Sequence, residues 1–500
     1  MTQTQQNTLW QVIKITCAAA IGGFLFGFDS AVINGTTLAL KATFDASDAS
    51  LGAAVSVALL SAAAGAYFAG RLADKFGRVR CMLAASFLFL ISALGSGMPF
   101  GIPDFIFWRA VGGAAIGIAS IIAPIYIAET APAHLRGRLG SMQQFAIVIG
   151  IFAALLSNWL VVRFAMALET NAILYTLPDF ILQQNGGFAN AYILGRTKAW
   201  QWMFWLEIIP ALLYGFFALR LPESPRFLVS QGRLSEAKEV LAKISPDDVD
   251  DEIDSIASTF KNSTPTKLSD LFETLTNGKR RIAPIIWAGL GIAIFQQLVG
   301  INVIFYYGNM LWQSVGFTEN DSMLLNVLSS IVNISMTIVA ILLIDKIGRK
   351  PLLLIGSIGM TFSLGLLAYC FLTAATDIYG NLLLAGISGP LSVLAANLFI
   401  IFFAMTWGPV MWVMLGEMFN NRIRAVAIAV CGLAQWGANF LVTFTFPILS
   451  GTAGPGLTYA LYTFFAFTSI SLYTERMSEK SPQEQRAGTL FQNEHTGNSL

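Results

Sequence analysis

Two oppositely charged residues lie inside long apolar stretches of the sequence. Asp29 falls in the stretch over about residues 12–36, and Arg109 in the stretch over about 104–128. In a bilayer each such charge costs about 3 kcal/mol, so an ionisable residue there is a functional hypothesis by default. Burial favours the neutral form of an isolated carboxyl, whereas a nearby guanidinium favours the ionised form. A change in their separation would therefore bind or release a proton. The alternative is a static ion pair that fixes helix packing.

Uncharged amides and aromatic rings form a second candidate group. The stretch over about 281–311 carries Gln296, Gln297, Asn302, Tyr306 and Tyr307. Amides donate and accept hydrogen bonds without a charge to desolvate, and an aromatic face covers the apolar C–H face of a ring. The combination suits a polyhydroxylated ligand. Gln297 and Asn302 would lie about 140° apart on a regular helix, so their convergence requires a local break. The sequence places Gly300 between them.

Other apolar stretches contribute further amides and indoles to the candidate set. These residues are Gln144, Asn333, Trp412, Gln435, Trp436 and Asn439. Polar side chains in membranes often only join neighbouring helices, for about 0.6 kcal/mol each, and this interpretation is favoured for Asn333 and Asn439 taken alone. Trp412 follows Gly408 and Pro409 within its stretch, which favours a hinge over a position at the lipid interface.

The elements that must position these side chains are membrane-spanning helices. Hydrophobic residues make up 55% of the 500-residue chain and charged residues only 12%, against about 25% charged in soluble proteins. Mean hydropathy is +0.65. Stretches of about 20 apolar residues can each cross a bilayer, and the sequence holds twelve. They lie at about 12–36, 50–70, 79–98, 104–128, 138–162, 200–221, 281–311, 322–344, 351–373, 386–416, 422–447 and 456–473.

Basic residues in the connections indicate the orientation of the chain. The connections after the even-numbered stretches, together with the stretch ends that flank them, carry 21 Lys and Arg residues, whereas the opposite connections carry four. Lys and Arg gather on the cytoplasmic side, so both termini are expected in the cytoplasm. No Lys or Arg precedes Lys14, so the first stretch lacks the charged start of a cleaved signal peptide. We therefore expect a multi-pass protein of the cell membrane, the inner or cytoplasmic membrane.

A polar stretch divides the twelve predicted helices into two sets of six. We expect an all-α polytopic fold with an N-terminal half over 1–221, a cytoplasmic helical linker over 222–280, a C-terminal half over 281–473 and a disordered cytoplasmic tail over 474–500. Within the linker, the amphipathic stretches Ser235–Ile244 and Leu268–Leu275 are predicted to be helical. The connection over about 163–199 is expected outside, where it could cap the outer mouth.

Charged motifs recur at matching places in the two halves. Asp74 and Arg78 follow the second stretch, and Asp345 and Arg349 follow the eighth, 271 residues later. The pair Glu129 and Arg136 recurs as Glu417 and Arg424, 288 residues later. This repetition is typical of a duplicated six-helix unit whose halves rock about a central site. Acids and arginines can pair with each other or with helix ends. They are predicted to gate the cytoplasmic rim, with plain topological anchoring as the alternative.

Several function classes find little support in the sequence. Four dispersed cysteines and two histidines, His134 and His495, form neither a metal-type spacing nor a disulfide framework. The net charge of +1 indicates no nucleic-acid partner. No GxxxxGK[ST] loop for nucleotide is present, and no nucleophile–base pair suggests an enzyme. We expect no cofactor, no bound metal and a monomer.

An ordered series of short motifs resembles the sugar porter family of the major facilitator superfamily over about residues 15–470. Any one motif is weak evidence, but PESPR and QQLVGIN are distinctive. The series is GGFLFGFD at 22–29, GRLADKFGR at 70–78, RAVGG at 109–113, PIYIAE at 124–129, RG at 136–137, PESPR at 222–226, QQLVGIN at 296–302 and WGPVMW at 407–412. The resemblance is greatest to bacterial proton-linked glucose and xylose carriers, cyanobacterial glucose transporters in particular.

The resemblance assigns expected roles to individual residues. Six match positions that line the sugar in family members, namely Gln144, Gln296, Gln297, Asn302, Trp412 and Gln435. Tyr306, Tyr307 and Trp436 would shape or gate the pocket, and Asn333 and Asn439 complete the candidate site. Glu207 matches a family acid that would relay or tune a proton held between Asp29 and Arg109. Glu223 and Arg226 of PESPR join the predicted cytoplasmic gating network.

Two motifs depart from the family pattern. The last helix usually ends in Pro-Glu-Thr-Lys-Gly, but here the region reads LYTERMS over 472–478, so the rim contact made by that string is not carried over. Before the sixth stretch, Trp200 is followed by Gln201 where the family often has Arg.

The resemblance implies a secondary transporter that carries a hexose such as glucose together with protons. A facilitated-diffusion uniporter stays open, because some facilitators keep an acid at the Asp29 position. A sugar sensor is a further alternative, although sensors tend to carry long tails and only about 26 residues follow the last predicted helix.

Overall fold

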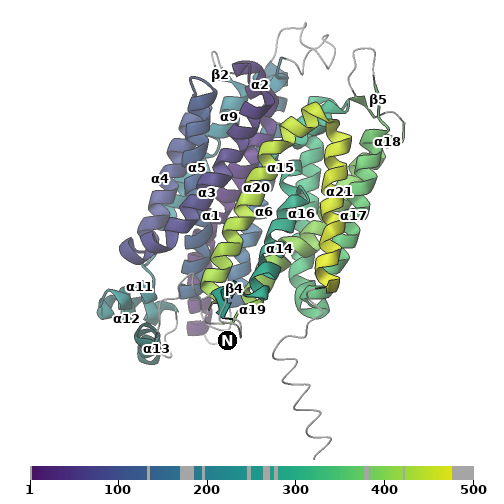
Figure 1. Cartoon of the computed structure of the whole chain (residues 1–500). Coiled ribbons are helices and arrows are strands. Elements are labelled where there is room, and N and C mark those ends of the chain that lie inside the picture. The colour runs from purple at the N-terminus through teal and green to yellow at the C-terminus, as the bar shows by residue number, and fades with distance from the viewer. Residues whose placement is uncertain are drawn as a thin grey trace, which may run out of the picture.

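The computed structural model describes residues 3–131, 136–168, 185–193, 197–244, 249–262, 271–274, 280–376, 382–384, 386–420 and 423–475. The predicted tail over 474–500 lies almost entirely outside these residues. The chain forms a bundle of long, roughly parallel and antiparallel helices, with α11, α12 and α13 set to one side at one end (Figure 1). We call this end the insert end and the opposite one the far end.

The first half of the bundle precedes the insert. Its elements are α1 (Gln3–Val32), η1 (Ile33–Gly35), α2 (Thr37–Phe44), α3 (Asp48–Phe76), α4 (Arg78–Gly97), α5 (Ile102–Thr130), α6 (Arg136–Leu168), η2 (Phe188–Asn190), β1 (Tyr192–Ile193), β2 (Thr197–Lys198), α9 (Ala199–Trp205) and α10 (Ile208–Ala218). The short antiparallel pair β1–β2 and the helix α2 lie at the far end (Figure 1).

The second half follows the insert and repeats the same up-and-down course. Its elements are α14 (Pro284–Leu298), α15 (Ile301–Ser314), α16 (Glu319–Ile347), α17 (Arg349–Leu372), β5 (Ala375–Thr376), β6 (Leu382–Leu383), α18 (Ser388–Phe402), the π-helical turn η4 (Phe403–Trp407), α19 (Gly408–Met418), α20 (Arg424–Thr452) and α21 (Gly454–Glu475). Among the described residues, eleven helical spans are long and apolar enough to cross a membrane. The 22-residue α21 packs along α17 and lies at the position of the twelfth predicted stretch.

The insert consists of α11 (Pro225–Ser230), α12 (Leu234–Ile244) and α13 (Val249–Asn262). The prediction of a helix at Ser235–Ile244 is therefore confirmed. The prediction at Leu268–Leu275 is wrong in its described part, because β3 (Phe272–Thr274) pairs there with β4 (Arg280–Ile282). Phe272, Glu273 and Thr274 alternate in the pattern of a strand. In so short an amphipathic stretch, this pattern cannot be distinguished from that of a helix.

Three of the predicted membrane segments are interrupted helices. The segment 281–311 breaks at Gly300, which adopts a left-handed conformation with φ of 80° and caps α15. The segment 386–416 passes through the π-helical turn just before Pro409, whose missing N–H cannot continue the regular ladder. The segment 200–221 turns at Leu206 and Glu207 between α9 and α10.

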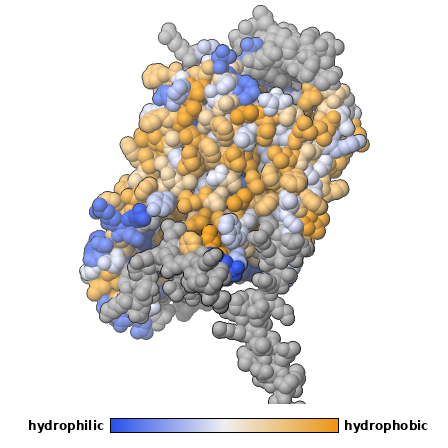
Figure 2. All heavy atoms as spheres, viewed as in Figure 1, coloured by the Kyte–Doolittle hydropathy of each residue, from blue (hydrophilic) through white to orange (hydrophobic). Residues whose placement is uncertain are grey.

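The surface and the core agree with a membrane protein. Figure 2 shows apolar residues over most of the visible face of the bundle and many hydrophilic residues on the insert. Many large apolar side chains of the long helices are exposed, for example Phe87, Phe362 and Phe467. The larger apolar core cluster contains residues of both halves, whereas the second combines the first half with the insert.

Candidate functional site

The amides predicted to converge meet in the middle of the second half. Asn302 Nδ2 donates to Gln297 Oε1 at 2.8 Å, and Gln297 Nε2 donates to Gln296 Oε1 at 3.1 Å. Gln435 Nε2 of α20 donates to the same Gln296 oxygen at 2.9 Å. We call these four residues the amide cluster. The predicted break at Gly300 is what turns Asn302 back toward Gln297.

The amide cluster is anchored on the second interrupted helix. Gln296 Nε2 donates to the backbone carbonyls of Trp407 at 3.1 Å and Gly408 at 3.3 Å. Trp407 is itself fixed, because its Nε1 donates to the Leu353 carbonyl and to Ser357 Oγ, both at 3.1 Å. Gln296 and Gln297 are buried. The cluster therefore joins α14, α15 and α20 to the π-helical turn.

The predicted tryptophans lie on α19 and α20. The Trp412 ring lies beside α20 near Gly432, one turn before Gln435, and is 41% exposed. Trp436 packs against Phe26 of α1, with 5.9 Å between the ring centres. Trp436 thus reaches the opposite half of the bundle.

The two tyrosines of α15 bind different neighbours. Tyr307 is fully buried and donates to the Thr443 carbonyl of α20 at 2.9 Å. The Tyr306 hydroxyl faces Asn439 of α20 and Ser30 of α1, one from each half. Asn439 Oδ1 also accepts from Thr443 Oγ1 at 3.2 Å. Tyr306 and Asn439 therefore lie at the boundary between the halves.

Two predicted site residues are not hydrogen-bonded to the amide cluster. Asn333 of α16 is buried, and no described residue bonds its side chain. Gln144 of α6 is half-buried and likewise makes no hydrogen bond to a described side chain. Its neighbour Gln143 packs against Gly23 of α1 instead. Among the described residues, the structure therefore shows no hydrogen bond from the side chains of Gln144 and Asn333 to the other candidates.

The predicted charge pair forms within the first half. Arg109 Nη1 of α5 contacts Asp29 Oδ1 of α1 at 2.5 Å, and Arg109 Nη2 donates to the Asp29 carbonyl at 3.0 Å. Both side chains are at most 2% exposed. Asp29 Oδ2 has no hydrogen-bond partner among the described residues. One carboxylate oxygen of Asp29 is therefore held by the arginine, whereas the other makes no hydrogen bond to a described residue.

A third ionisable residue adjoins this pair. Glu207, at the turn between α9 and α10, is fully buried and lies close to the Asp29 carboxylate and Arg109. Neither of its carboxyl oxygens has a hydrogen-bond partner within the described part of the chain. The backbone interruption before α10 brings Glu207 to this position. Two carboxyls thus lie beside a single guanidinium.

One residue that the sequence analysis missed joins the two halves at the far end. Asn34 of η1 donates to the carbonyls of Ile304 at 3.3 Å and Phe305 at 3.0 Å. Its Oδ1 accepts from the Asn309 backbone N–H at 3.0 Å and from Asn326 Nδ2 at 3.1 Å. Asn34 is only 1% exposed. Asn34 therefore joins η1 to α15 and α16 by hydrogen bonds, which a lone Asn in the sequence did not indicate.

Helix packing closes the far end at two further places. Gly52 of α3 touches α20 so closely that an added Cβ would lie 2.4 Å from the Phe444 carbonyl oxygen. Trp159 Nε1 of α6 donates to Asn320 Oδ1 of α16 at 3.2 Å. The far ends of the two halves are therefore in direct contact.

The predicted gating network of the first half forms at the insert end. Arg78 binds both carboxylate oxygens of Glu129, at 2.8 and 2.9 Å, and contacts the exposed Asp74 at 3.3 Å. Glu223 accepts from the backbone N–H groups of Arg78 and Val79 at the start of α4. This network fixes α4, α5 and the insert to one another.

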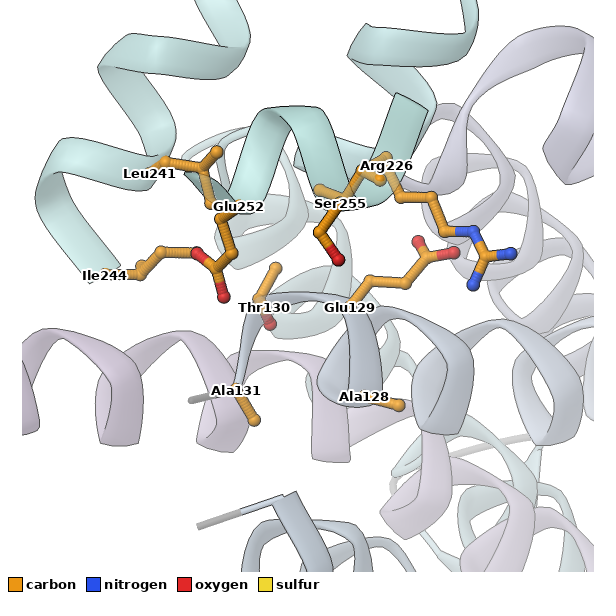
Figure 3. Close-up of a pocket in the computed structure, with 10 residues that line it drawn as sticks. Ala128, Glu129, Thr130, Ala131, Arg226, Leu241, Ile244, Glu252 and Ser255 are labelled. Carbon is orange, nitrogen blue, oxygen red and sulfur yellow. The ribbon is translucent and has the colours of Figure 1, made fainter. Parts of the chain in front are cut away.

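A pocket of about 280 Å³ lies beside this network, between α5 and the insert. Figure 3 shows the Arg226 guanidinium next to the Glu129 carboxylate at one side of the pocket, with Glu252 at the other. Ser224 Oγ, just before Arg226, donates to Glu129 at 2.6 Å. Arg226 thus belongs to the same charged group as Glu129.

The corresponding network of the second half is more exposed. Arg349 Nη2 contacts Glu417 at 2.8 Å, and these side chains are 29% and 54% exposed. Arg424 donates to the Phe419 carbonyl at the end of α19 rather than to Glu417. The side chains of Asp345 and Arg136 lie outside the described residues. Each ion pair described at the insert end lies within one half or within the insert.

The buried amides offer hydrogen-bond donors and acceptors at an interrupted helix. The buried carboxyls of Asp29 and Glu207 lie beside Arg109 within the first half. Within the described residues, no group of His, Cys, Asp and Glu side chains could hold a metal ion.

Comparisons with known proteins give consistent matches along nearly the whole chain. A family model described as sugar (and other) transporter matches residues 15–475. A glucose transport protein of Synechocystis sp. is 49% identical over 459 residues, which are 92% of this chain and 93% of that protein. A D-xylose-proton symporter of Escherichia coli is 33% identical over 89% of this chain and 87% of its own.

Solved structures match equally well. The partially occluded inward-open conformation of the xylose transporter XylE from E. coli has a TM-score of 0.73 at 31% identity, covering 92% of this chain and 97% of that chain. The inward-open conformation of the same transporter also gives 0.73, at 30% identity, covering 95% and 99% of the two chains.

Proposed function

Because the chain belongs to the sugar porter family of the major facilitator superfamily, we propose that it carries a hexose, glucose in the first place, across the cytoplasmic membrane together with protons. The transport would proceed by alternating access, in which the two halves rock about a central site. The similarity to a glucose transport protein supports the hexose. The similarity to xylose-proton symporters supports the coupling to protons.

The amide cluster is the observation that carries this proposal. Sugar hydroxyls both donate and accept hydrogen bonds, and so do Gln296, Gln297, Asn302 and Gln435. We propose that a sugar exchanges its hydroxyls for the present amide–amide bonds. Trp412 would cover the apolar face of the ring. Gln144 and Asn333 would bind sugar only after the first half or α16 moves toward the cluster.

The charge pair supplies the proposed coupling. The ionised Asp29 pairs with Arg109, and protonation from one side would release the arginine. Since the carboxyl of Glu207 lies beside that of Asp29, it would tune how readily Asp29 takes a proton. Tyr306 lies between Ser30 of α1 and Asn439 of α20. It therefore offers a path by which a change at Asp29 reaches the sugar site, and such coupling must be reciprocal.

We propose that the insert end and both termini face the cytoplasm, which follows from the excess of Lys and Arg in the connections at that end. The far end then faces outside, and its closure makes this conformation inward-facing. Its agreement with inward-open XylE supports that assignment. Asn34 and the tyrosines of α15 would form the outer gate. The networks of Arg78 with Glu129 and of Arg349 with Glu417 would gate the cytoplasmic side.

The remaining features of the proposal follow from the division of the chain. We propose that residues 1–221 and 281–473 are the moving halves, that 222–280 links them, and that a monomer suffices because each half supplies its part of the path. Transport needs no cofactor and no enzymatic step.

Uptake of labelled glucose into proteoliposomes tests the proposal, with and without an inwardly directed proton gradient. We expect accumulation above the outside concentration for the wild type. Asp29→Asn should lose accumulation but keep exchange of sugar at equilibrium, because the fixed neutral side chain no longer cycles a proton. Asp321→Asn, which removes an exposed acid from α16, is the matched control. Equilibration without accumulation, indifferent to the gradient and to Asp29, would instead establish a facilitated-diffusion uniporter.

A further inference from the structure

A buried carboxylate of the second half binds a loop of the first half at the far end. Glu319, the first residue of α16, is 6% exposed. Its Oε2 accepts from the Phe188 backbone N–H at 2.6 Å, and its Oε1 accepts from the Ala189 backbone N–H at 3.0 Å. These N–H groups belong to residues 185–193, a segment that we call the strap. The carboxylate thus bridges the two halves.

The strap itself is fixed to the first half. Asn190 Oδ1 accepts from Thr43 Oγ1 of α2 at 2.9 Å. Thr43 is held in turn by Lys198 Nζ at 3.1 Å. Ile193 packs in a small apolar cluster with Ala165 of α6. Because these anchors all lie in the first half, the strap must move with α2 and α6.

The backbone of the strap is shaped around the carboxylate. Gly187 has φ of 66°, a conformation that L side chains rarely adopt. A Cβ added there would lie 2.4 Å from Glu319 Oε2. Only a glycine therefore lets the chain pass this close to the carboxylate and present two successive N–H groups to it.

We propose that Glu319 is a gating residue of the transport cycle, whose bonds to the strap hold the outer side closed. The inference rests on the alternating access of the proposed function. Opening the outer side separates the far ends of the halves, which pulls the strap away from α16. Both bonds to Glu319 must then break, in addition to those of Asn34. The strap therefore raises the free energy needed to open the outer side above the value that the helix contacts alone would set.

The distance between two spin labels on opposite sides of the far end tests this proposal. Labels at Met98→Cys, after α4, and Thr373→Cys, after α17, report on outer opening, because both positions are exposed and lie in different halves. A Cys17→Ser background removes the exposed native thiol. We expect Glu319→Ala to raise the ratio of outward-open to outward-closed molecules by about tenfold, since two hydrogen bonds to a charged acceptor are lost.

Two further variants separate gating from general damage. Gly187→Ala should also raise the outward-open fraction, because it displaces the strap without touching the Glu319 charge. Asp321→Ala removes an exposed acid from the same turn of α16 and should leave the distances as in the wild type. Glu319→Gln, which keeps one acceptor oxygen, should fall between the wild type and Glu319→Ala.

The distances are measured without sugar and without a proton gradient, so they do not depend on the proposed substrate or coupling. An unchanged distance distribution in folded Glu319→Ala and Gly187→Ala protein would overturn the gating role of Glu319. Such a result would leave the uptake test of the proposed function unaffected. A failure of that uptake test would likewise leave the distance result standing.

Discussion

Gln296 is the residue on which the proposed sugar site depends most. Its oxygen accepts from Gln297 and Gln435, and its nitrogen donates to the carbonyls of Trp407 and Gly408. The backbone carbonyls fix which way the amide faces, because a carbonyl can only accept. A ligand hydroxyl that replaces Gln297 or Gln435 therefore meets an acceptor of known position.

Gln297→Ala should weaken glucose binding at least tenfold. The variant removes one donor and one acceptor of the amide cluster and leaves Asn302 without its present partner, and each lost bond is worth about 1 kcal/mol or more. Glucose affinity can be measured by calorimetry on purified protein. Thr445→Val is the control, since Thr445 bonds only the backbone of its own helix. Wild-type affinity in Gln297→Ala would remove Gln297 from the site.

At the residue scale, the contacts that could be predicted from the sequence are those between residue types that are unusual in an apolar helix. Asp29 with Arg109 and Gln297 with Asn302 were predicted because a charge or a run of amides is rare in an apolar helix. Asn34 was missed because a single Asn at the end of an apolar stretch looks like any polar residue that joins two helices. Glu319 was missed because an acid in the first turn of a helix usually faces solvent.

At the scale of elements, interrupted helices create the polar surfaces of the site. A regular helix uses its own N–H and C=O groups, whereas the breaks at Gly300 and at η4 re-aim Asn302 and expose carbonyls to Gln296. The break at Gly300 could be predicted, because glycine tolerates a positive φ between two residues that had to converge. No comparable sequence feature indicates the turn at Glu207 or the π-helical turn, because tertiary packing determines where these helices are interrupted.

Gly300→Ala should reduce glucose transport at least tenfold in a protein that still folds. An alanine at φ of 80° is strained, and its Cβ would lie 2.6 Å from the Tyr462 ring. Relief of the backbone strain and of the clash with Tyr462 would straighten the segment and separate Asn302 from Gln297. Initial uptake rates and thermal unfolding check this expectation. Gly416→Ala of α19 serves as the control, because an added Cβ there meets open space. Equal uptake rates in Gly300→Ala and Gly416→Ala would contradict the role of the break at Gly300.

At the scale of the whole molecule, the two halves touch at the far end and are separately braced at the insert end. The twelve-helix fold followed from composition, loop charges and the repeated motifs. The conformational state did not, because both states of an alternating transporter satisfy the same hydrophobic pattern and differ by only a few kcal/mol. The strap illustrates the limit, since the sequence indicated its outer position but no bond to Glu319.

Gly52→Val should trap the transporter with its outer side open. A side chain at Gly52 cannot fit against the Phe444 carbonyl of α20, so the far ends can no longer meet. We expect glucose uptake to fall at least tenfold, whereas binding of glucose from outside should change little, because the population shifts toward the outward-open state. Gly70→Val lies on the same helix and faces open space, so its uptake should match the wild type. Normal uptake by Gly52→Val would show that this contact is dispensable.

The hydrogen bonds within the amide cluster also affect the rate of transport. Asn302, Gln297, Gln296 and Gln435 form a continuous chain of three hydrogen bonds. A sugar must displace these bonds, so its net gain in binding free energy is small, and the amides can bond to one another again as the sugar departs. The hydrogen bonds within the amide cluster thus reduce the free-energy difference between bound and unbound sugar, so the bound sugar dissociates quickly. A carrier built in this way gives up tight affinity for a short residence time, which favours rapid turnover at plentiful sugar.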